Sequence, residues 1–316
     1  MYFDNHHCAA CGRALAFDPG TLSMASEEEK GSGLPTCTQR TGYIRCNWLA
    51  PDGGLCLSCR SSKTIPGLSK IVNRARWRKL EHAKRRLIYD LLRHGLPVSP
   101  KRLRFVFKED RRSNPDVSDD HVAIGHLDGV ITINAAEADE VYREEMRQRM
   151  NEPLRTLLGH FRHESGHYYF DVVLDEAQKK EARLLFGDER VDYNTALQTY
   201  YDQGPVQGWQ NWYISAYASA HPMEDWAECW AHYLHLRAAL EAADTQGLKI
   251  MGPETDWHQG WVSLALGLNE VLRSLGLPDA YPFVITPTIA TKIEFVHNAI
   301  KDFSSRQREP QATGVQ

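Results

Sequence analysis

Residues 152–174 read EPLRTLLGHFRHESGHYYFDVVL, and they contain an H-E-x-x-H motif at residues 163–167. Apolar residues recur in this stretch at three- and four-residue spacing, which predicts a helix with one face in the core. Residues four apart lie on the same helix face, so His163 and His167 can bind one zinc ion through their imidazoles. Glu164 would then stand beside a water on the metal and act as its general base.

A zinc hydrolase needs a third protein ligand and an open fourth position. Residues 217–235 read YASAHPMEDWAECWAHYLH, and their apolar spacing after Pro222 predicts a second helix. Glu224 lies in the first turn of that helix and is the expected third ligand. Glu228, one turn further on, is expected to accept a hydrogen bond from the N–H of a ligand histidine. Tyr217 can direct its hydroxyl at the oxyanion of a tetrahedral intermediate.

Two other carboxylates compete for a place at the metal. Asp171 is one helical turn beyond His167, and we expect it to support the site by accepting a hydrogen bond from a nearby side chain. Glu189 lies 22 residues after His167, within GDERVDY (residues 187–193), and is the rival third ligand. Glu224 is favoured because it alone has a tyrosine and a second glutamate at suitable spacing.

Six of the seven cysteines fall between residues 8 and 59, and a C-x-x-C pair stands at each end of the set. Thiolates on such tight turns are the usual tetrahedral zinc ligands, and a segment this small needs a staple to fold. Residues 1–66 are therefore predicted to form a zinc ribbon.

The partition of these cysteines between zinc sites has two solutions. The first solution is one four-thiolate site, formed by Cys37, Cys46, Cys56 and Cys59. It leaves Cys8 and Cys11 outside the site, either alone or helped by His6 and His7. The second solution joins Cys8 and Cys11 to Cys56 and Cys59. We favour the first, and expect one catalytic zinc and one or two structural zincs in the whole chain.

Composition and charge place the chain among ordinary globular proteins. With 316 residues it can hold one large domain and a small one, and 42% of its residues are hydrophobic. A formal net charge of −4 argues against a chain that binds nucleic acid along its whole surface. The first residues lack the features of a signal peptide, and no apolar run is long enough to cross a bilayer. We therefore expect a cytoplasmic protein without a membrane partner.

Three phrases resemble a bacterial family that combines a zinc ribbon with a zinc-binding metallopeptidase: GHFRHESGHYYFD, LFGDERVDY and HPMEDWAECWAHYLH. The pattern H-E-x-x-H followed by Y-x6-E-D-W-A-E is also similar to the gluzincin metallopeptidases, especially their lethal-factor-like branch. In that branch the corresponding glutamate ligates zinc and the upstream tyrosine assists catalysis, which the resemblance carries onto Glu224 and Tyr217. Family members also have a further C-x-x-C ahead of the pair matching Cys8 and Cys11, and this sequence does not contain it.

The resemblance covers nearly the whole chain and implies its architecture. We expect an α+β fold in which a small zinc ribbon precedes a mainly helical, zincin-like domain with a short antiparallel sheet. The predicted domain boundaries are 1–66 for the ribbon and 67–304 for the metallopeptidase domain, followed by a disordered tail at 305–316. Residues 18–36 are expected to form a flexible loop. Residues 258–275 and 289–303 are expected to form two further helices.

A basic helix is predicted over residues 77–92, and basic side chains crowd residues 74–86. One interpretation is a surface beside the ribbon that contacts nucleic acid or a protein partner. The other, which we favour, is a solvated basic face whose opposite side lies on the core.

Short β-type runs at residues 103–107, 121–125 and 130–133 predict strands, and Asp128-Gly129 between the last two favours a hairpin turn. Residues 129–134 are predicted to be an edge strand that aligns an extended peptide substrate. The alternative is a strand paired on both sides. Asn134 is expected to cap a helix of about fifteen residues.

These expectations together favour a zinc metallopeptidase that cleaves peptide or protein substrates. An alternative class is a binding or regulatory module, for protein or nucleic acid, in which the zincin site is latent or inactive. A metal-dependent amidase that acts on another amide is a third possibility, because zinc chemistry is common to all amides.

Overall fold

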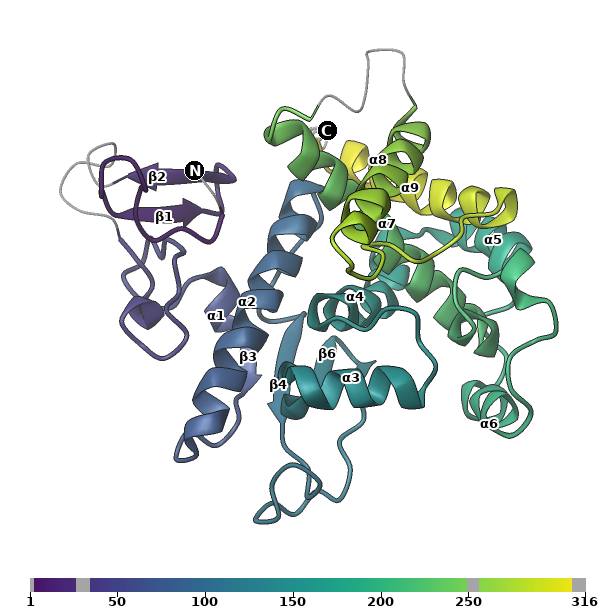
Figure 1. Cartoon of the computed structure of the whole chain (residues 1–316), viewed down its shortest axis with the longest axis horizontal. Coiled ribbons are helices and arrows are strands. Elements are labelled where there is room, and N and C mark those ends of the chain that lie inside the picture. Colours follow the sequence, from purple (N-terminus) through teal and green to yellow (C-terminus); the bar gives the residue numbers. More distant parts are fainter. Residues whose placement is uncertain (1–2, 27–34, 249–255, 309–316) are drawn as a thin grey trace, which may run out of the picture. The chain divides into compact units, whose positions relative to one another are not determined.

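The computed structural model describes residues 3–26, 35–248 and 256–308 (Figure 1). It divides the chain into two compact units. The first unit comprises Met1–Met146 and Thr156–Phe161, and the second comprises Arg147–Arg155 and Arg162–Gln316. The first unit thus extends past the predicted domain boundary at residue 66, and takes in the basic helix and the sheet. Each unit is built around its own buried residues.

The N-terminal part of the first unit contains an antiparallel hairpin. Strands β1 (Leu15–Asp18) and β2 (Ser23–Ser26) pair directly, followed by a 3-10 turn η1 (Thr38–Arg40) and the short helix α1 (Leu57–Arg60). Phe17 packs on Trp48 with ring centroids 4.8 Å apart, and both rings are buried. The expected loop at 18–36 is therefore wrong over its first part, where the chain turns back into β2. Residues 27–34 lie outside the described part of the chain.

A four-stranded sheet follows in the first unit. Its order is β3 (Ser62–Thr64), β4 (Arg104–Lys108), β6 (Val130–Asn134) and β5 (Gly125–Leu127). Only β5 and β6 run antiparallel, whereas β3–β4 and β4–β6 are parallel. The α+β, mainly helical class is confirmed, but the sheet is mixed rather than antiparallel. Parallel pairing needs a long connection that brings the chain back in the same direction. Helix α2 provides it between β3 and β4. Residues 109–124 and β5 provide it between β4 and β6.

The hairpin turn between β5 and β6 is confirmed. Asp128 and Gly129 both have positive φ, 48° and 74°, as a two-residue type I′ turn requires. The strand before it starts at Gly125 rather than at residue 121. The edge-strand prediction for residues 129–134 is wrong, because β6 pairs with β4 on one side and β5 on the other. Its buried, alternating residues suit an interior strand, and the edges of the sheet are β5 and β3.

Helix α2 (Ile71–Arg93) carries the basic residues, and it uses most of them within the first unit. Arg76 binds Asp139 at 2.6 Å, and the buried Lys84 binds the buried Glu81 at 2.8 Å. The remaining contacts are Arg74 to the Leu68 carbonyl, Arg78 to the Tyr43 carbonyl, Lys79 to Glu140, and Arg86 to Asp4. The favoured interpretation, a solvated basic face, is therefore wrong for Arg76, Lys84 and Arg85, which are buried. Recognition of nucleic acid or a protein partner by this helix stays an untested prediction.

The helix predicted after Asn134 is interrupted. A buried 3-10 turn, η2 (Ala135–Ala138), comes first, and α3 (Glu140–Arg149) begins only after Asp139. The Asn134 side chain accepts from the Ala136 N–H, which caps η2 and not a long helix. Asp139 is extended, and its carboxylate binds Arg76, so the chain changes direction there.

The second unit is helical in its described part. Its helices are α4 (Leu157–Val173, which begins in the first unit), α5 (Glu176–Phe186), α6 (Tyr193–Gln203), α7 (Pro222–Thr245), α8 (Trp257–Ser274) and α9 (Pro287–Arg308), with 3-10 turns η3 (Trp209–Asn211) and η4 (Tyr217–Ala220). Helix α7 packs against α5, α8 and α9, and Figure 1 shows these helices gathered around it. Helix α9 runs to Arg308, so the tail predicted from 305 starts with helical residues. Residues 309–316 lie outside the described part. None of the described helices combines the length and apolar character that a bilayer crossing needs.

Helices α4 and α7 meet at Gly166, inside the H-E-x-x-H motif. A Cβ atom placed on Gly166 would lie 2.9 Å from the Ala227 Cα and 3.1 Å from a ring carbon of Trp230. The indole N–H of Trp226 donates to the Gly166 carbonyl at 2.9 Å, and the indole N–H of Trp230 donates to the Ser165 hydroxyl at 3.0 Å. The glycine is therefore required by the approach of another helix.

Replacing Gly166 by alanine should destabilise the protein, although alanine is the better helix former. The new methyl group would overlap a backbone atom, a type of overpacking that costs about 1–3 kcal/mol. Gly267, in the interior of α8, has open space where a Cβ would lie, so Gly267→Ala should stabilise by roughly 0.5–1 kcal/mol. Urea unfolding of both variants gives the comparison, and a Gly166→Ala protein as stable as Gly267→Ala would contradict the close contact.

Candidate metal centres

Four cysteines converge in the first unit. The sulfurs of Cys37, Cys46, Cys56 and Cys59 all lie within 4.8 Å of one another, and all four residues are buried. The Cys46 and Cys56 sulfurs are 3.6 Å apart, close to the roughly 3.8 Å edge of a tetrahedron with zinc–sulfur bonds of about 2.3 Å. The donor set and its spacing therefore fit one structural zinc ion.

The backbone around these cysteines also suits thiolate ligands. The N–H of Cys59 points at the Cys56 sulfur and the N–H of Cys56 at the Cys37 sulfur, each at 3.4 Å. Hydrogen bonds from Cys46, Cys56 and Cys59 hold the pKa of the Cys37 thiol far below its usual range. The same contacts raise the pKa of the Cys56 and Cys59 thiols, so these two keep their protons until a metal ion displaces them.

Cys8 and Cys11 stay outside this cluster. They form a tight turn in which the Gly12 N–H bonds the Cys8 carbonyl at 2.8 Å, and Cys11 is exposed. The structure thus arranges the cysteines as in the first of the two partitions, and the second, which drew Cys56 and Cys59 to Cys8 and Cys11, does not occur.

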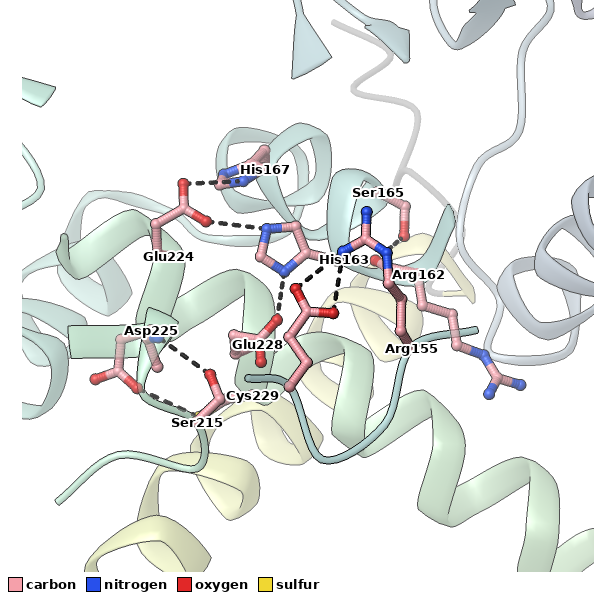
Figure 2. A network of polar contacts seen from close by, with 12 residues as sticks. Arg155, Arg162, His163, Ser165, His167, Ser215, Glu224, Asp225, Glu228 and Cys229 are labelled. Atoms are coloured by element: carbon pink, nitrogen blue, oxygen red, sulfur yellow. Dashed lines mark hydrogen bonds and ion pairs between the residues drawn. The ribbon is translucent and has the colours of Figure 1, made fainter. Parts of the chain in front are cut away.

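His163, His167 and Glu224 converge in the second unit. Helix α4 supplies the two histidines at i and i+4, and the first turn of α7 supplies the glutamate. Glu224 Oε2 lies 3.0 Å from His163 Nε2, and Glu224 Oε1 lies 3.4 Å from His167 Nε2. Figure 2 shows both imidazoles turned toward the carboxylate. The ligand atoms lie within 4.8 Å of one another.

Glu228 fixes the orientation of His163. Its Oε1 lies 2.7 Å from His163 Nδ1, on the opposite side of the ring from Glu224 (Figure 2). If Nδ1 donates its proton to Glu228, the second ring nitrogen, Nε2, faces the Glu224 carboxylate at 3.0 Å, and this contact is favourable only when a proton or a metal ion lies between the two atoms. This donor set therefore fits a divalent metal ion. Burial lowers the pKa of His163, but without a metal Glu224 and Glu228 outweigh burial and raise that pKa well above its usual range, so Nε2 then holds the proton that a bound metal ion would displace.

Glu224 is prepared to be anionic even though it is fully buried. Burial raises its pKa, but the hydrogen bonds with His163 and His167 outweigh burial and hold the pKa well below its usual range. A buried carboxylate that carries no proton is a strong ligand for zinc.

Glu164 and Tyr217 lie around the same ligands. Glu164 is buried, and its charge contributes to raising the pKa of both Tyr217 and Tyr193. The Tyr217 ring lies 6.1 Å from the His163 ring. Burial, followed by the charge of Glu224, raises the pKa of Tyr217 far above its usual range, so its hydroxyl keeps its proton and remains a donor.

Neither rival carboxylate belongs to the ligand cluster. Glu189 is bound by the guanidinium of Arg183, with contacts of 2.9 and 3.2 Å from Nε. Asp171 accepts a hydrogen bond from a nearby side chain as expected, from Lys179 at 2.8 Å, but its own side chain is 75% exposed and lies outside the ligand cluster. Each four-residue step rotates a side chain by about 40° around the helix axis, so Asp171, two steps after His163, has turned toward solvent.

Sequence reasoning missed two residues that support the site. The Tyr193 hydroxyl donates to Glu224 Oε1 at 2.6 Å. Asp225 is fully buried and pairs with the buried Lys292 of α9 at 2.5 Å, which ties α7 to α9 directly beside Glu224. Burial raises the pKa of Asp225 to about 7 despite this cation. The sequence signal for Asp225 was an acidic residue among apolar neighbours on a buried helix.

The fold and these two donor sets define a zinc-ribbon protein with a second metal centre carried by helices. Residues 73–299 match the model of the family described as "Putative zinc-binding metallo-peptidase", and residues 1–70 match a zinc-ribbon domain. The chain belongs to that metallopeptidase family. Zinc is accordingly the metal that the donor sets fit.

Similar proteins come from mycobacteria. One relative from Mycobacterium bovis and two from strains of Mycobacterium tuberculosis are each 37% identical to this chain over 327 residues, which cover 96% of this chain and 92% of the relative. Each is described as an uncharacterized protein. No solved structure matches the chain.

Proposed function

We propose that this protein is a zinc-dependent metallopeptidase of the H-E-x-x-H, gluzincin type that hydrolyses peptide bonds in a peptide or protein substrate. The observation that carries the proposal is the convergence of His163, His167 and Glu224, with Glu228 fixing the first histidine. A purely structural zinc site would have no use for Glu164 next to the ligands. Family membership supports the same activity.

Each side chain has a role that follows from its position. His163, His167 and Glu224 would hold the ion, and Glu228 would keep His163 in the tautomer that offers Nε2. When bound, zinc acidifies a water molecule and polarises the carbonyl of the scissile peptide. Glu164 takes the proton from the attacking water and passes it to the departing amine. Tyr217, which remains protonated, donates its hydroxyl to the oxyanion.

Cleavage of unmodified peptides by the purified, zinc-loaded chain is the expected result. A peptide mixture derived from a bacterial proteome is incubated with the protein, and mass spectrometry identifies new termini that share a sequence preference. Treatment with 1,10-phenanthroline should abolish the new termini, and zinc added back after removal of the chelator should restore them. The ribbon variant Cys56→Ser/Cys59→Ser, if it folds, shows whether the ribbon zinc is needed for cleavage.

Full zinc occupancy of the histidine site without cleavage of any peptide would contradict the proposal. It would favour the alternative class, a binding or regulatory module whose zincin site is inactive. Cleavage of a non-peptide amide alone would instead point to an amidase with the same zinc chemistry.

A further inference from the structure

Helix α6 (Tyr193–Gln203) is an unusual element of the second unit, because none of its residues is buried. Gly187 and Gly204 flank the segment that contains it, and both have positive φ, 98° and 81°. Tyr201, on this helix, is 61% exposed. A helix without a buried face gains little free energy from packing, so its position has to be fixed by a few specific contacts.

Those contacts lead to the candidate metal centre. The Tyr193 hydroxyl donates to Glu224 Oε1 at 2.6 Å, and the Tyr193 ring lies 5.0 Å from the ring of His221, the residue that caps α7. Further along α6, the Tyr200 ring packs edge-on against Tyr217 at 5.8 Å. The helix therefore rests on the metal centre through aromatic side chains.

The bond to Glu224 has a clear chemical consequence. Glu224 has no exposed surface, and only one of its oxygens has a hydroxyl donor: Oε2 lies 3.0 Å from His163 Nε2, whereas Oε1 receives the Tyr193 hydroxyl and lies 3.4 Å from His167 Nε2. A strong donor on one oxygen prevents rotation of the carboxylate and favours coordination through the other.

We propose that Tyr193 is a positioning residue of the zinc site, and that through it zinc binding and the docking of α6 are coupled. The inference rests on the zinc-binding part of the proposed function, and not on catalysis. The coupling is reciprocal: the free energy by which docked α6 strengthens zinc binding through Tyr193 equals the free energy by which bound zinc stabilises the docked position of α6.

The test compares Tyr193→Phe with Tyr200→Phe. Each variant loses one tyrosine hydroxyl from α6, but only the hydroxyl of Tyr193 bonds Glu224. Competition with a chromophoric chelator measures the affinity of each zinc site in the full chain, and the four-cysteine site serves as an internal reference. Loss of a partner of this kind weakens metal binding by about 10–100-fold. In Tyr193→Phe we expect zinc affinity to fall by this factor at the histidine site and to stay unchanged at the four-cysteine site. In Tyr200→Phe we expect the zinc affinity of the histidine site to change by less than about twofold.

Hydrogen exchange supplies a readout that does not depend on activity. Zinc should slow the exchange of amides in α6 in the wild type and in Tyr200→Phe, and should slow it much less in Tyr193→Phe. Equal zinc affinity and equal protection of α6 in the two variants would overturn the inference. A wild type that binds no zinc at the histidine site would overturn both this inference and the proposed function, whereas zinc affinities that shift as expected without peptide cleavage would count against the proposed function alone.

Discussion

Replacing Glu164 by glutamine should abolish peptide cleavage while both zinc sites remain filled. The amide has the size and shape of the carboxylate but cannot take a proton from the attacking water. Glu164 is not part of the cluster of ligand atoms, so the histidine site should keep its metal. Loss of a general base reduces rates on the order of 10²–10⁴-fold, which is the largest effect expected of any single substitution here.

The measurement is the rate of cleavage of a peptide identified in the screen, together with the zinc content of the same sample. Glu176→Gln provides a matched control, because Glu176 lies on the exposed first turn of α5 and its side chain is 81% exposed. This control should cleave at the wild-type rate. A Glu164→Gln protein that retains activity would remove Glu164 from the mechanism.

Replacing Glu224 by alanine should remove about one zinc ion per chain and leave the ribbon zinc in place. Glu224 supplies the only carboxylate of the histidine cluster, and without it two neutral imidazoles alone face the ion. Structural and catalytic zinc sites in proteins use at least three protein ligands. The zinc content of purified protein, measured by atomic emission, gives the result directly.

Two companion variants make this zinc count decisive. Glu189→Ala removes the rival carboxylate, which is bound to Arg183, and should leave both zinc ions in place. Cys56→Ser/Cys59→Ser should remove the ribbon zinc and spare the histidine site. If Glu224→Ala keeps its full zinc content and Glu189→Ala does not, the third ligand has been assigned to the wrong residue.

The parts of the site that follow local periodicity could be predicted from the sequence. His163 and His167 share a helix face by spacing alone, and Glu224 with Glu228 repeats that logic on a second helix. Tyr193 could not be found in this way, because its place depends on how the segment 187–204 folds back over α7. That path is set by positive-φ glycines and long-range contacts that spacing does not encode.

The strands were harder to predict than the helices. The turn at Asp128-Gly129 could be predicted because its chemistry is local. Which strand lies at the edge of the sheet could not, because it depends on the pairing of β6 with β4 across a long connection. The prediction of one long helix after Asn134 was wrong for a similar reason. Asp139 binds Arg76, which is 63 residues away in sequence, and no local propensity can anticipate that contact.

The contact at Gly166 determines how the metal centre holds its shape. Gly166 has no side chain, so the main chain of α4 lies directly against the Cα atom of Ala227 and against the buried Trp230 side chain of α7. Side chains exchange rotamers easily, whereas two helices in backbone contact move only as rigid bodies. The distance between the two histidines on α4 and Glu224 on α7 is thus preorganised, and this nearly fixed distance limits which metal ions fit. The remaining freedom at Glu224, rotation of its carboxylate, is restrained by the Tyr193 hydroxyl of the exposed helix α6.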